Sequence, residues 1–599
     1  MKSFLKQFFT AALGSLFGLF AAIVALFVIV PLMIAVFSGA KGTSMEPIQD
    51  KSILELRLHG ELVERHRPMD FEFFGGHSLL ADDRTMGLYD LNKAIEIAKN
   101  DKRVVGIYLE IGSFQAGWAG LSSLRRRLAE FAATGKWIIA YADRLDEMGY
   151  YLASVAGHLY MEPYGELELN GLAIQETFIK GLLSKLEVEP EIFRVGKFKA
   201  AIEPLIRDEM SKENREQTQT LIDDIWNVVR DTTAVETKLS LERIDELTSR
   251  LEVVSSESAK LAKIITDTKF VDEVESDLRV ASVGEENELE LVSPGRLLRS
   301  HSDKKSGAKK IAVIFLDGEI QDGESGRDTV GSYDARADIE EAKSDEDVAA
   351  IVVRVNSPGG DALASDVIWR AVRQTDEEIP VVISIGDVAA SGGYYIASGG
   401  RYIFAESTTI TGSIGVFGIM FNAQKFFKNK AGVLFDKVVT HPHADIGSMA
   451  RPVSPEEGKV IQAGVDRVYK RFIDVVAESR GYEKRSDLEA IAEGRVWSGR
   501  RAKDLGLVDE LGGLDQAIAK AAEFAEIKDY KIEIFPSDID PLRHLIERLS
   551  GEASTHIFGQ VFGARFMGLE MRDMKALEKK VASVKNGVYA RLLYDLRIK

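Results

Sequence analysis

The sequence predicts an α/β protein built from two tandem copies of one strand-and-helix unit, preceded by a transmembrane helix. The first supporting observation is an internal repeat, in which GYYLAS at residues 149–154 returns as GYYIAS at residues 393–398, which is 393 − 149 = 244 residues later. The same offset superposes the apolar residues 104–111 and 348–355 without a gap. The second observation is a long uncharged, apolar stretch near the amino terminus.

Each copy alternates short apolar segments with amphipathic ones, a pattern that predicts strand-helix crossovers and a parallel sheet. Residues 351–355 and 381–385 are nearly continuously apolar, as in strands that helices cover on both faces. Residues 211–235 and 454–480 are predicted to be long helices with one charged side. The unit therefore combines buried strands with surface helices in both copies.

These features divide the chain into five predicted segments. A polar, lysine-rich stretch separates the copies, and the last segment lies outside the repeat. Within that last segment, residues 557–593 mix apolar and basic residues at helical spacing. Such a helix could rest on the membrane or pack on the body of the protein. The predicted segments are residues 1–47 (tail, anchor and linker), 48–299 (first copy, with the candidate lysine), 300–310 (linker), 311–535 (second copy, with the candidate serine) and 536–599 (extension).

The composition excludes several classes of protein. The chain has 76 Lys and Arg against 94 Asp and Glu, and this net charge of −18 argues against nucleic acid as a partner. It contains no cysteine, which excludes disulfides, thiolate metal sites and a cysteine nucleophile. The nine histidines show no metal-ligand spacing, so we expect neither a metal nor another cofactor.

Residues 7–40 contain no charge and are rich in Leu, Ile, Val, Phe and Ala. This segment is long enough to cross a bilayer. We expect an uncleaved anchor in the lipid bilayer through residues 8–38, with signal-peptide cleavage near residues 38–40 as the alternative. Lys2 and Lys6 precede the span, whereas the charges after it are mixed. This asymmetry predicts an amino terminus inside the cytoplasm and a body outside it.

Ser391, in AASGG, is a candidate nucleophile, since it is expected at a turn between a buried strand and a helix. The amino terminus of that helix would favour developing negative charge, and Gly392 and Gly393 would let a substrate carbonyl approach closely. The alternative is that Ser391 only caps the helix. At the matching position the first copy has Glu147.

The NSPGG motif at residues 356–360 is predicted to lie beside that serine, because both follow neighbouring parallel strands. Its turn can aim the backbone N–H groups of Gly359 and Gly360 into the same crevice, where Gly392 supplies another. Together these amides would form an oxyanion hole. The first copy has GSFQA at residues 112–116 instead, so we expect its crevice to be inactive.

A serine nucleophile needs a base. The candidates are His441, His443 and Lys199 of the first copy, which matches His443 at the repeat offset. A lysine acts as a base only when burial or a positive neighbour lowers its pKa from about 10.4. Arg194 and Lys197 could provide such charge, Lys197 is itself a rival base, and a solvated lysine is the alternative.

Four motifs, taken together, closely resemble the long form of the signal peptide peptidase A (protease IV) family. The likeness extends over the anchor and nearly all of residues 50–535, and the motifs agree in order and spacing. They are RVGKFK at residues 194–199, NSPGG at 356–360, AASGGYY at 389–395 and TGSIG at 411–415.

The resemblance implies a Clp-protease/crotonase-like spiral fold in each half. It also implies Ser391 as nucleophile, Lys199 as general base and Ser413 as the hydroxyl that orients the lysine. It further implies a homotetramer on the outer face of the bacterial cytoplasmic membrane that degrades signal peptides left after secretion. The expected function is thus a membrane-anchored serine endopeptidase with peptide substrates.

Two alternatives remain from the sequence. A crotonase-type enzyme acting on acyl-CoA would use the same fold and oxyanion geometry, although an exported body should meet little CoA. A non-catalytic membrane scaffold would have two inactive crevices, with the glycine turns serving only for packing.

Overall fold

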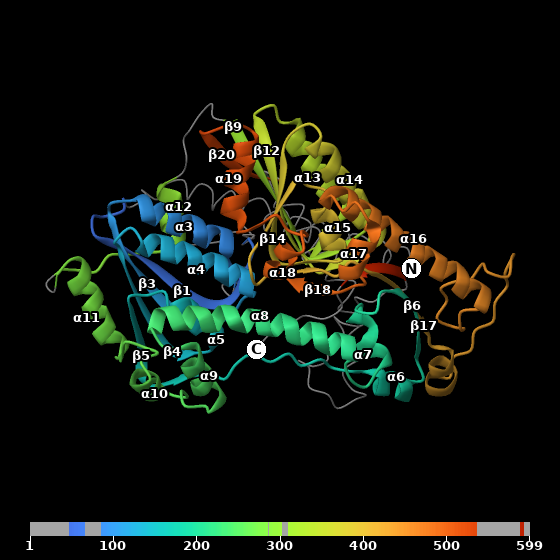
Figure 1. Ribbon diagram of the computed structural model, residues 1–599, viewed down its shortest axis with the longest axis horizontal. Helices are drawn as coiled ribbons and strands as arrows, with labels where there is room; N and C mark the ends of the chain where they lie inside the picture. Colours follow the sequence, from blue (N-terminus) through green and yellow to red (C-terminus); the bar gives the residue numbers. More distant parts are fainter. Residues whose placement is uncertain are drawn as a thin grey trace, which may run out of the picture. The chain divides into compact units, whose positions relative to one another are not determined.

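The computed structural model describes residues 47–65, 85–284, 287–301, 309–326, 328–535 and 587–591 (Figure 1). Apart from residues 47–49, all of these belong to one compact unit. The predicted membrane anchor, residues 8–38, lies outside the described residues. None of the helices in the described part of the chain has the length and apolar character needed to span a bilayer.

A seven-stranded sheet forms the core of the first copy. All its strand pairings are parallel, which confirms the prediction from strand-helix alternation. Across the sheet the strands follow the order β2 (Thr85–Gly87), β1 (Ser52–Val63), β3 (Val104–Gln115), β4 (Trp137–Leu145), β5 (His158–Leu167) and β7 (Asp267–Thr268), and β8 (Leu291–Val292) pairs with β1.

An eight-stranded sheet forms the core of the second copy. It is parallel except where β16 meets β18. Its order is β18 (Val496–Ser498), β16 (Ile410–Gly412), β14 (Val381–Ala390), β12 (Val348–Ser357), β9 (Lys309–Asp317) and β20 (Tyr530–Phe535), and β15 (Tyr402–Ala405) pairs with both β14 and β19 (Glu510–Leu511).

The helices repeat in the predicted register. The pair α3 (Leu88–Asn100) and α13 (Ser332–Ser344) and the pair α4 (Trp118–Ala132) and α14 (Ala362–Asp376) begin and end 244 residues apart. The long helices α8 (Lys212–Thr237) and α16 (Pro455–Arg480) each follow a serine that caps them. The others are α5 (Glu147–Ala153), α6 (Lys180–Leu186), η2 (Ala200–Ile202), α7 (Glu203–Ile206), α9 (Leu241–Ser249), α10 (Ser256–Leu261), α11 (Val271–Ser282), α12 (Pro294–Ser300), α15 (Gly392–Ala397), the π-helical η3 (Phe426–Ala431), α17 (Arg485–Ile491), α18 (Gly499–Asp504) and α19 (Leu514–Phe524).

A third sheet joins the two copies. Strand β6 (Glu189–Val195) of the first copy pairs antiparallel with β17 (Val416–Asn422) of the second, and the two lie side by side in Figure 1. Strand β21 (Gly587–Arg591) lies between β17 and β13 (Gly359–Asp361). The sequence pattern around β21 predicts a helix, so that prediction is wrong for these five residues. The order is β11 (Thr329–Gly331), β10 (Glu319–Gln321), β13 (Gly359–Asp361), β21 (Gly587–Arg591), β17 (Val416–Asn422) and β6 (Glu189–Val195).

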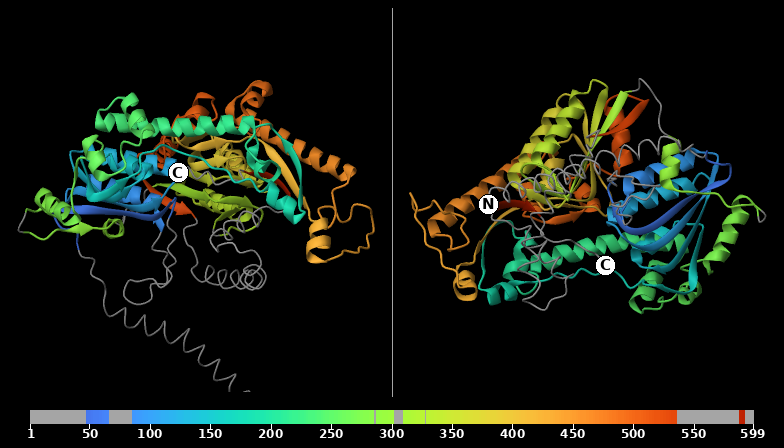
Figure 2. Two further views of the ribbon diagram at one scale, coloured as in Figure 1. Left: turned by 90° about the horizontal axis from the view of Figure 1, so that it is seen from below. Right: turned by 180° about the vertical axis from the view of Figure 1, so that it is seen from behind.

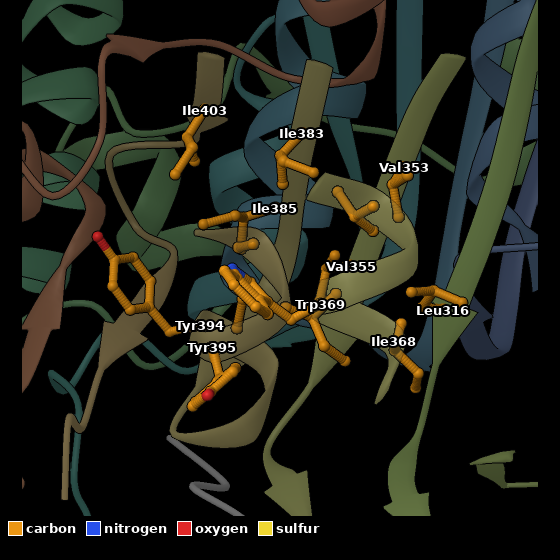
Figure 3. Packing of buried hydrophobic residues seen from close by; sticks show 14 of the residues in the cluster. Leu316, Val353, Val355, Ile368, Trp369, Ile383, Ile385, Tyr394, Tyr395 and Ile403 are labelled. Atoms are coloured by element: carbon orange, nitrogen blue, oxygen red, sulfur yellow. The ribbon is translucent and has the colours of Figure 1, made fainter. Parts of the chain in front are cut away.

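The core of the second copy holds α15 against the sheet (Figure 3). Val353 and Ile383 of neighbouring strands pack with Trp369 of α14, and all three are buried. Tyr394 and Tyr395 extend from α15 into the same cluster, where the hydroxyl of Tyr394 donates to the carbonyl of Leu507 at 2.7 Å. Because these side chains fix α15, they also fix the residue directly before it, which is Ser391.

Buried charges line the joint between the copies. Arg354 of β12 donates from two guanidinium nitrogens to Glu64, at 2.9 and 2.8 Å, and both side chains are buried. Asp387 of β14 accepts from the backbone N–H of Gly120 at 2.8 Å. Desolvation, and then the charge of Glu64, raises the pKa of Asp387 to about 6. A buried ion pair contributes little net stability but costs much when one partner is lost, so removal of Glu64 or Arg354 would leave an uncompensated buried charge at the joint.

Candidate active site

Ser391 occupies the sharp turn between β14 and α15. Its backbone has φ 56° and ψ −115°, and its side chain makes no capping hydrogen bond, so the capping alternative is wrong. The residue is fully buried in the chain. A positive φ at a non-glycine residue costs about 1–3 kcal/mol and typically occurs at functional sites. Such a strained turn between a strand and a helix is the usual setting of a serine nucleophile.

Lys199 reaches this serine from the other copy. It lies between β6 and η2, and the exposed fraction of the residue is 1%. Its Nζ is 2.7 Å from Ser391 Oγ, 3.0 Å from Ser413 Oγ and 3.1 Å from the carbonyl oxygen of Ser413. All three oxygens are uncharged, so nothing at these contacts stabilises an ammonium as a carboxylate would.

Burial lowers the pKa of Lys199 well below its usual value. The alternative of a solvated lysine is therefore wrong. Burial alone accounts for the lowered pKa, so the expectation that positive neighbours contribute is also wrong. The side chain of Lys197 is 61% exposed and forms an ion pair with Glu493 at 2.9 Å, and Arg194 is exposed on β6. Lys197 is thus turned toward a carboxylate at the surface.

The backbone around Ser413 is shaped to hold the lysine. Ser413 has φ 50°. Its hydroxyl accepts a hydrogen bond from Lys199 Nζ and donates one to the carbonyl of Gly494 at 3.2 Å. Gly494 has φ 81°, and a Cβ added there would lie 2.7 Å from the Cβ of Lys199. Glycine is therefore required at position 494 for two reasons, conformation and space.

The predicted oxyanion glycines lie on β13 and at the start of α15. Gly359 has φ 98°, and its N–H donates to the hydroxyl of Ser357 at 3.2 Å. A Cβ at Gly360 would lie 1.9 Å from the carbonyl oxygen of Ile320 on β10, so the two strands require a glycine there. A Cβ at Gly393 would lie 2.6 Å from the carbonyl oxygen of Ser357, which shows that the NSPGG and ASGG motifs meet as predicted.

The first copy has a carboxylate where the second has its serine. Glu147 begins α5, and its Oε1 accepts hydrogen bonds from the N–H groups of Asn170 and Gly171 at 2.7 and 2.9 Å. Burial raises the pKa of this carboxyl. Glu147 thus ties α5 to the loop after β5, and the inactivity of this crevice stays a prediction.

The predicted equivalence of Lys199 and His443 is wrong at the level of local structure. Lys199 follows strand β6, whereas His443 lies in an irregular loop between η3 and α16. The side chain of His443 is 55% exposed and its Nδ1 lies 3.0 Å from Glu457 Oε1. His441 is exposed in the same loop. The repeat offset of 244 residues therefore does not hold through this segment.

Comparison with known proteins identifies the family. Peptidase family S49 matches residues 130–283 and 373–528, one segment in each copy. Protease 4 of Salmonella typhi is 35% identical over 523 residues, which cover 84% of this chain and 83% of that protein. The chloroplastic serine protease SPPA of Arabidopsis thaliana is 31% identical over 557 residues, which cover 91% of this chain and 78% of that protein. The chain belongs to peptidase family S49.

Family membership makes the chain a serine peptidase, and the acyl-CoA and scaffold alternatives are not favoured. A putative signal peptide peptidase SppA of Enterococcus faecium is 32% identical over 235 residues, which cover 38% of this chain and 68% of that protein. Among solved structures, a membrane-bound stomatin-specific protease covers 41% of this chain at 17% identity with a TM-score of 0.27.

Replacing Gly494 by alanine tests the packing around Lys199. The new methyl group would push the lysine away, so we expect kcat/KM for a peptide substrate to fall by about 10- to 100-fold. Gly447→Ala is the matched control, since Gly447 has φ 87° but nothing within 4 Å of an added Cβ. The two variants share the backbone strain and differ in contact with Lys199. Equal activities of the two variants would contradict this account of the site.

Proposed function

We propose that the chain is an endopeptidase in which Ser391 is the nucleophile and Lys199 the general base. Ser391 Oγ attacks the scissile carbonyl carbon, while Lys199 takes the hydroxyl proton and passes it to the leaving amine. The observation that carries the proposal is the 2.7 Å distance between Lys199 Nζ and Ser391 Oγ. The lowered pKa of Lys199 supports it, because only an uncharged amine can accept the proton.

Ser413 and three glycines complete the proposed machinery. Ser413 Oγ, 3.0 Å from the lysine nitrogen, orients the amine toward the serine. The backbone N–H groups of Gly359, Gly360 and Gly392 stabilise the oxyanion of the tetrahedral intermediate. Since the Gly359 N–H donates to a serine hydroxyl in this structure, the oxyanion would replace that hydroxyl as acceptor.

We further propose that substrates bind as an extended strand between β13 and β17. Strand β21 supports this, since it pairs antiparallel with both, Gly360 opposite Ala590 and Phe417 opposite Tyr589. Without β21, β13 and β17 would each present an unpaired edge next to Ser391, and such edges bind extended peptides through main-chain hydrogen bonds. Residues 587–591 would therefore compete with substrates for this place.

The proposed setting is a membrane. The anchor through residues 8–38 would hold the amino terminus inside and the catalytic body on the outer face of the bacterial cytoplasmic membrane. Hydrophobic peptides released there, remnants of signal peptides above all, would be the substrates. We propose a homotetramer in which each half of the chain, residues 48–299 and 311–535, has a Clp-protease/crotonase-like spiral fold, joined by residues 300–310 and followed by the extension 536–599.

Removing either partner of the dyad tests the proposed chemistry. We expect Ser391→Ala and Lys199→Met each to lower kcat/KM for a peptide by at least about 1000-fold. The double variant should lose no more than either single variant, because the two groups act as a unit. Lys197→Met is the control, since this exposed lysine pairs with Glu493, and it should keep activity within about twofold.

The dyad experiment also needs a measure of folding. Thermal unfolding should show that each inactive variant remains folded, and a serine-directed phosphonate should label the parent chain at Ser391 and leave Ser391→Ala unlabelled. A folded Ser391→Ala or Lys199→Met chain with more than a tenth of the parent activity would refute the assignment.

Truncation of the carboxyl terminus tests the peptide site. A chain that ends at residue 586 lacks β21, so we expect KM for a peptide substrate to fall at least about threefold at unchanged kcat, because no internal strand competes. A chain that ends at residue 591 keeps β21 and should match the full-length protein. If the chain that ends at residue 586 had an unchanged KM, β21 would not compete with substrate. The same conclusion would follow if this chain lost activity while the chain that ends at residue 591 kept it.

A further inference from the structure

A buried glutamine links the loop that carries Lys199 to β18, which pairs with β16, the strand beside Ser391. Gln217 lies within α8, the long green helix in Figure 2. This helix contacts α5 of the first copy and β18 of the second. Its exposed fraction is 1%. Its Nε2 donates to the carbonyl of Phe198 at 3.1 Å, and its Oε1 accepts from the N–H of Val496 at 3.2 Å. One side chain thus binds the backbone of both copies.

Both backbone partners of Gln217 lie close to the proposed dyad, Phe198 one step from Lys199 and Val496 two steps from Ser391. Phe198 directly precedes Lys199. Val496 begins β18 and lies opposite Gly412 of β16, and the carbonyl of Gly412 accepts from the N–H of Ser391 at 2.8 Å. The Gln217 amide therefore connects the segment that carries the base to the strands next to the nucleophile.

The neighbours of Gln217 determine which end of its amide is the nitrogen. Nε2 also donates to Oδ1 of Asn214 at 3.3 Å, and Asn214 is buried and uses its own nitrogen to donate to Glu176 at 3.0 Å. In the reversed orientation, the oxygen of Gln217 would face two acceptors and its nitrogen would face the N–H of Val496. The donor and acceptor roles of the amide are therefore fixed.

Other contacts join the loop that carries Lys199 to residues that precede β18 in the sequence. The N–H of Phe198 donates to the carbonyl of Glu493 at 3.0 Å, and the guanidinium of Arg495 lies 4.6 Å from the ring centres of both Phe198 and Trp497. These contacts tie the loop to the segment before the strand, whereas Gln217 ties it to the N–H of the strand's first residue. Gln217 is thus placed to set the distance between the loop that carries Lys199 and strand β18.

We propose that Gln217 is a positioning residue for the peptidase reaction, whose amide holds Lys199 Nζ within hydrogen-bonding distance of Ser391 Oγ. The inference rests on the proposed Ser391–Lys199 dyad. Gln217 touches neither the substrate nor the reacting atoms. Proton transfer requires the donor and acceptor within about 3.2 Å, and a displacement of about 1 Å can cost 100-fold in rate. A looser loop would also admit water to Lys199 and return its pKa toward the ordinary value.

The test is Gln217→Met, which keeps the length of the side chain and removes its three hydrogen bonds, with Phe198, Asn214 and Val496. The activity is divided by the amount of Ser391 that a serine-directed phosphonate titrates, so that unfolded chain does not count. We expect kcat per titrated serine to fall about 10- to 100-fold, KM to change less than about threefold, and the rising limb of the pH profile of kcat to move to higher pH.

Gln219→Met is the matched control. Gln219 lies two residues further along α8 and donates to Asp223 at 2.7 Å on the exposed side of the helix. It should leave kcat, KM and the pH profile unchanged. If Gln217→Met does not fold, Gln217→Glu serves instead, because it keeps an acceptor for Val496 and loses the donor to Phe198. The same fall in kcat and shift of the pH profile are expected.

Unchanged kcat per titrated serine and an unchanged pH profile in the Gln217 variants would overturn the inference, even if their thermal unfolding temperatures were lower. That result would indicate a purely structural glutamine. Failure of the dyad gives a different result, since Ser391→Ala would then retain activity and the parent chain would take up no phosphonate at Ser391.

Discussion

The close approach of a buried amine from one copy to a serine hydroxyl from the other is the contact on which the site depends. Lys199 Nζ lies 2.7 Å from Ser391 Oγ, and burial lowers the lysine pKa. Desolvating an amine is unfavourable, so the fold must hold the lysine there by other interactions. The antiparallel pairing of β6 with β17 and the hydrogen bonds around Ser413 supply that support.

Duplication followed by divergence explains why the site needs both copies. The helices before and after the central strands keep one register, yet the first copy has Glu147 where the second has Ser391. The Glu147 carboxylate accepts two backbone hydrogen bonds from the loop after β5, so this position serves a structural contact in the first copy. The second copy in turn lacks a counterpart of Lys199, since its corresponding segment is an irregular loop. Each copy is therefore incomplete alone.

The sequence could predict the parallel sheets and the repeat because these depend on local patterns, and motifs together with the family resemblance singled out the candidate site residues. Ser391, Lys199 and Ser413 lie in short motifs, and the structure brings the three together. The repeat offset misplaced His443, because the copies diverge after β5. Neither Gln217 nor Gly494 could be predicted, since each acts through partners hundreds of residues away or through a lack of space for a Cβ. Strand β21 was missed because its pairing, not its own composition, makes it a strand.

The pH dependence of phosphonate labelling at Ser391 tests the central claim most directly, since this reaction needs the serine and its base but no peptide binding. An amine accepts a proton only when deprotonated, so the labelling rate should rise with pH through the lowered pKa of Lys199. The rate should reach its plateau well below the ordinary lysine pKa of about 10.4, and Lys199→Arg should abolish fast labelling at every pH. A rise centred near the ordinary lysine pKa, or an unchanged profile in Lys199→Arg, would contradict the account.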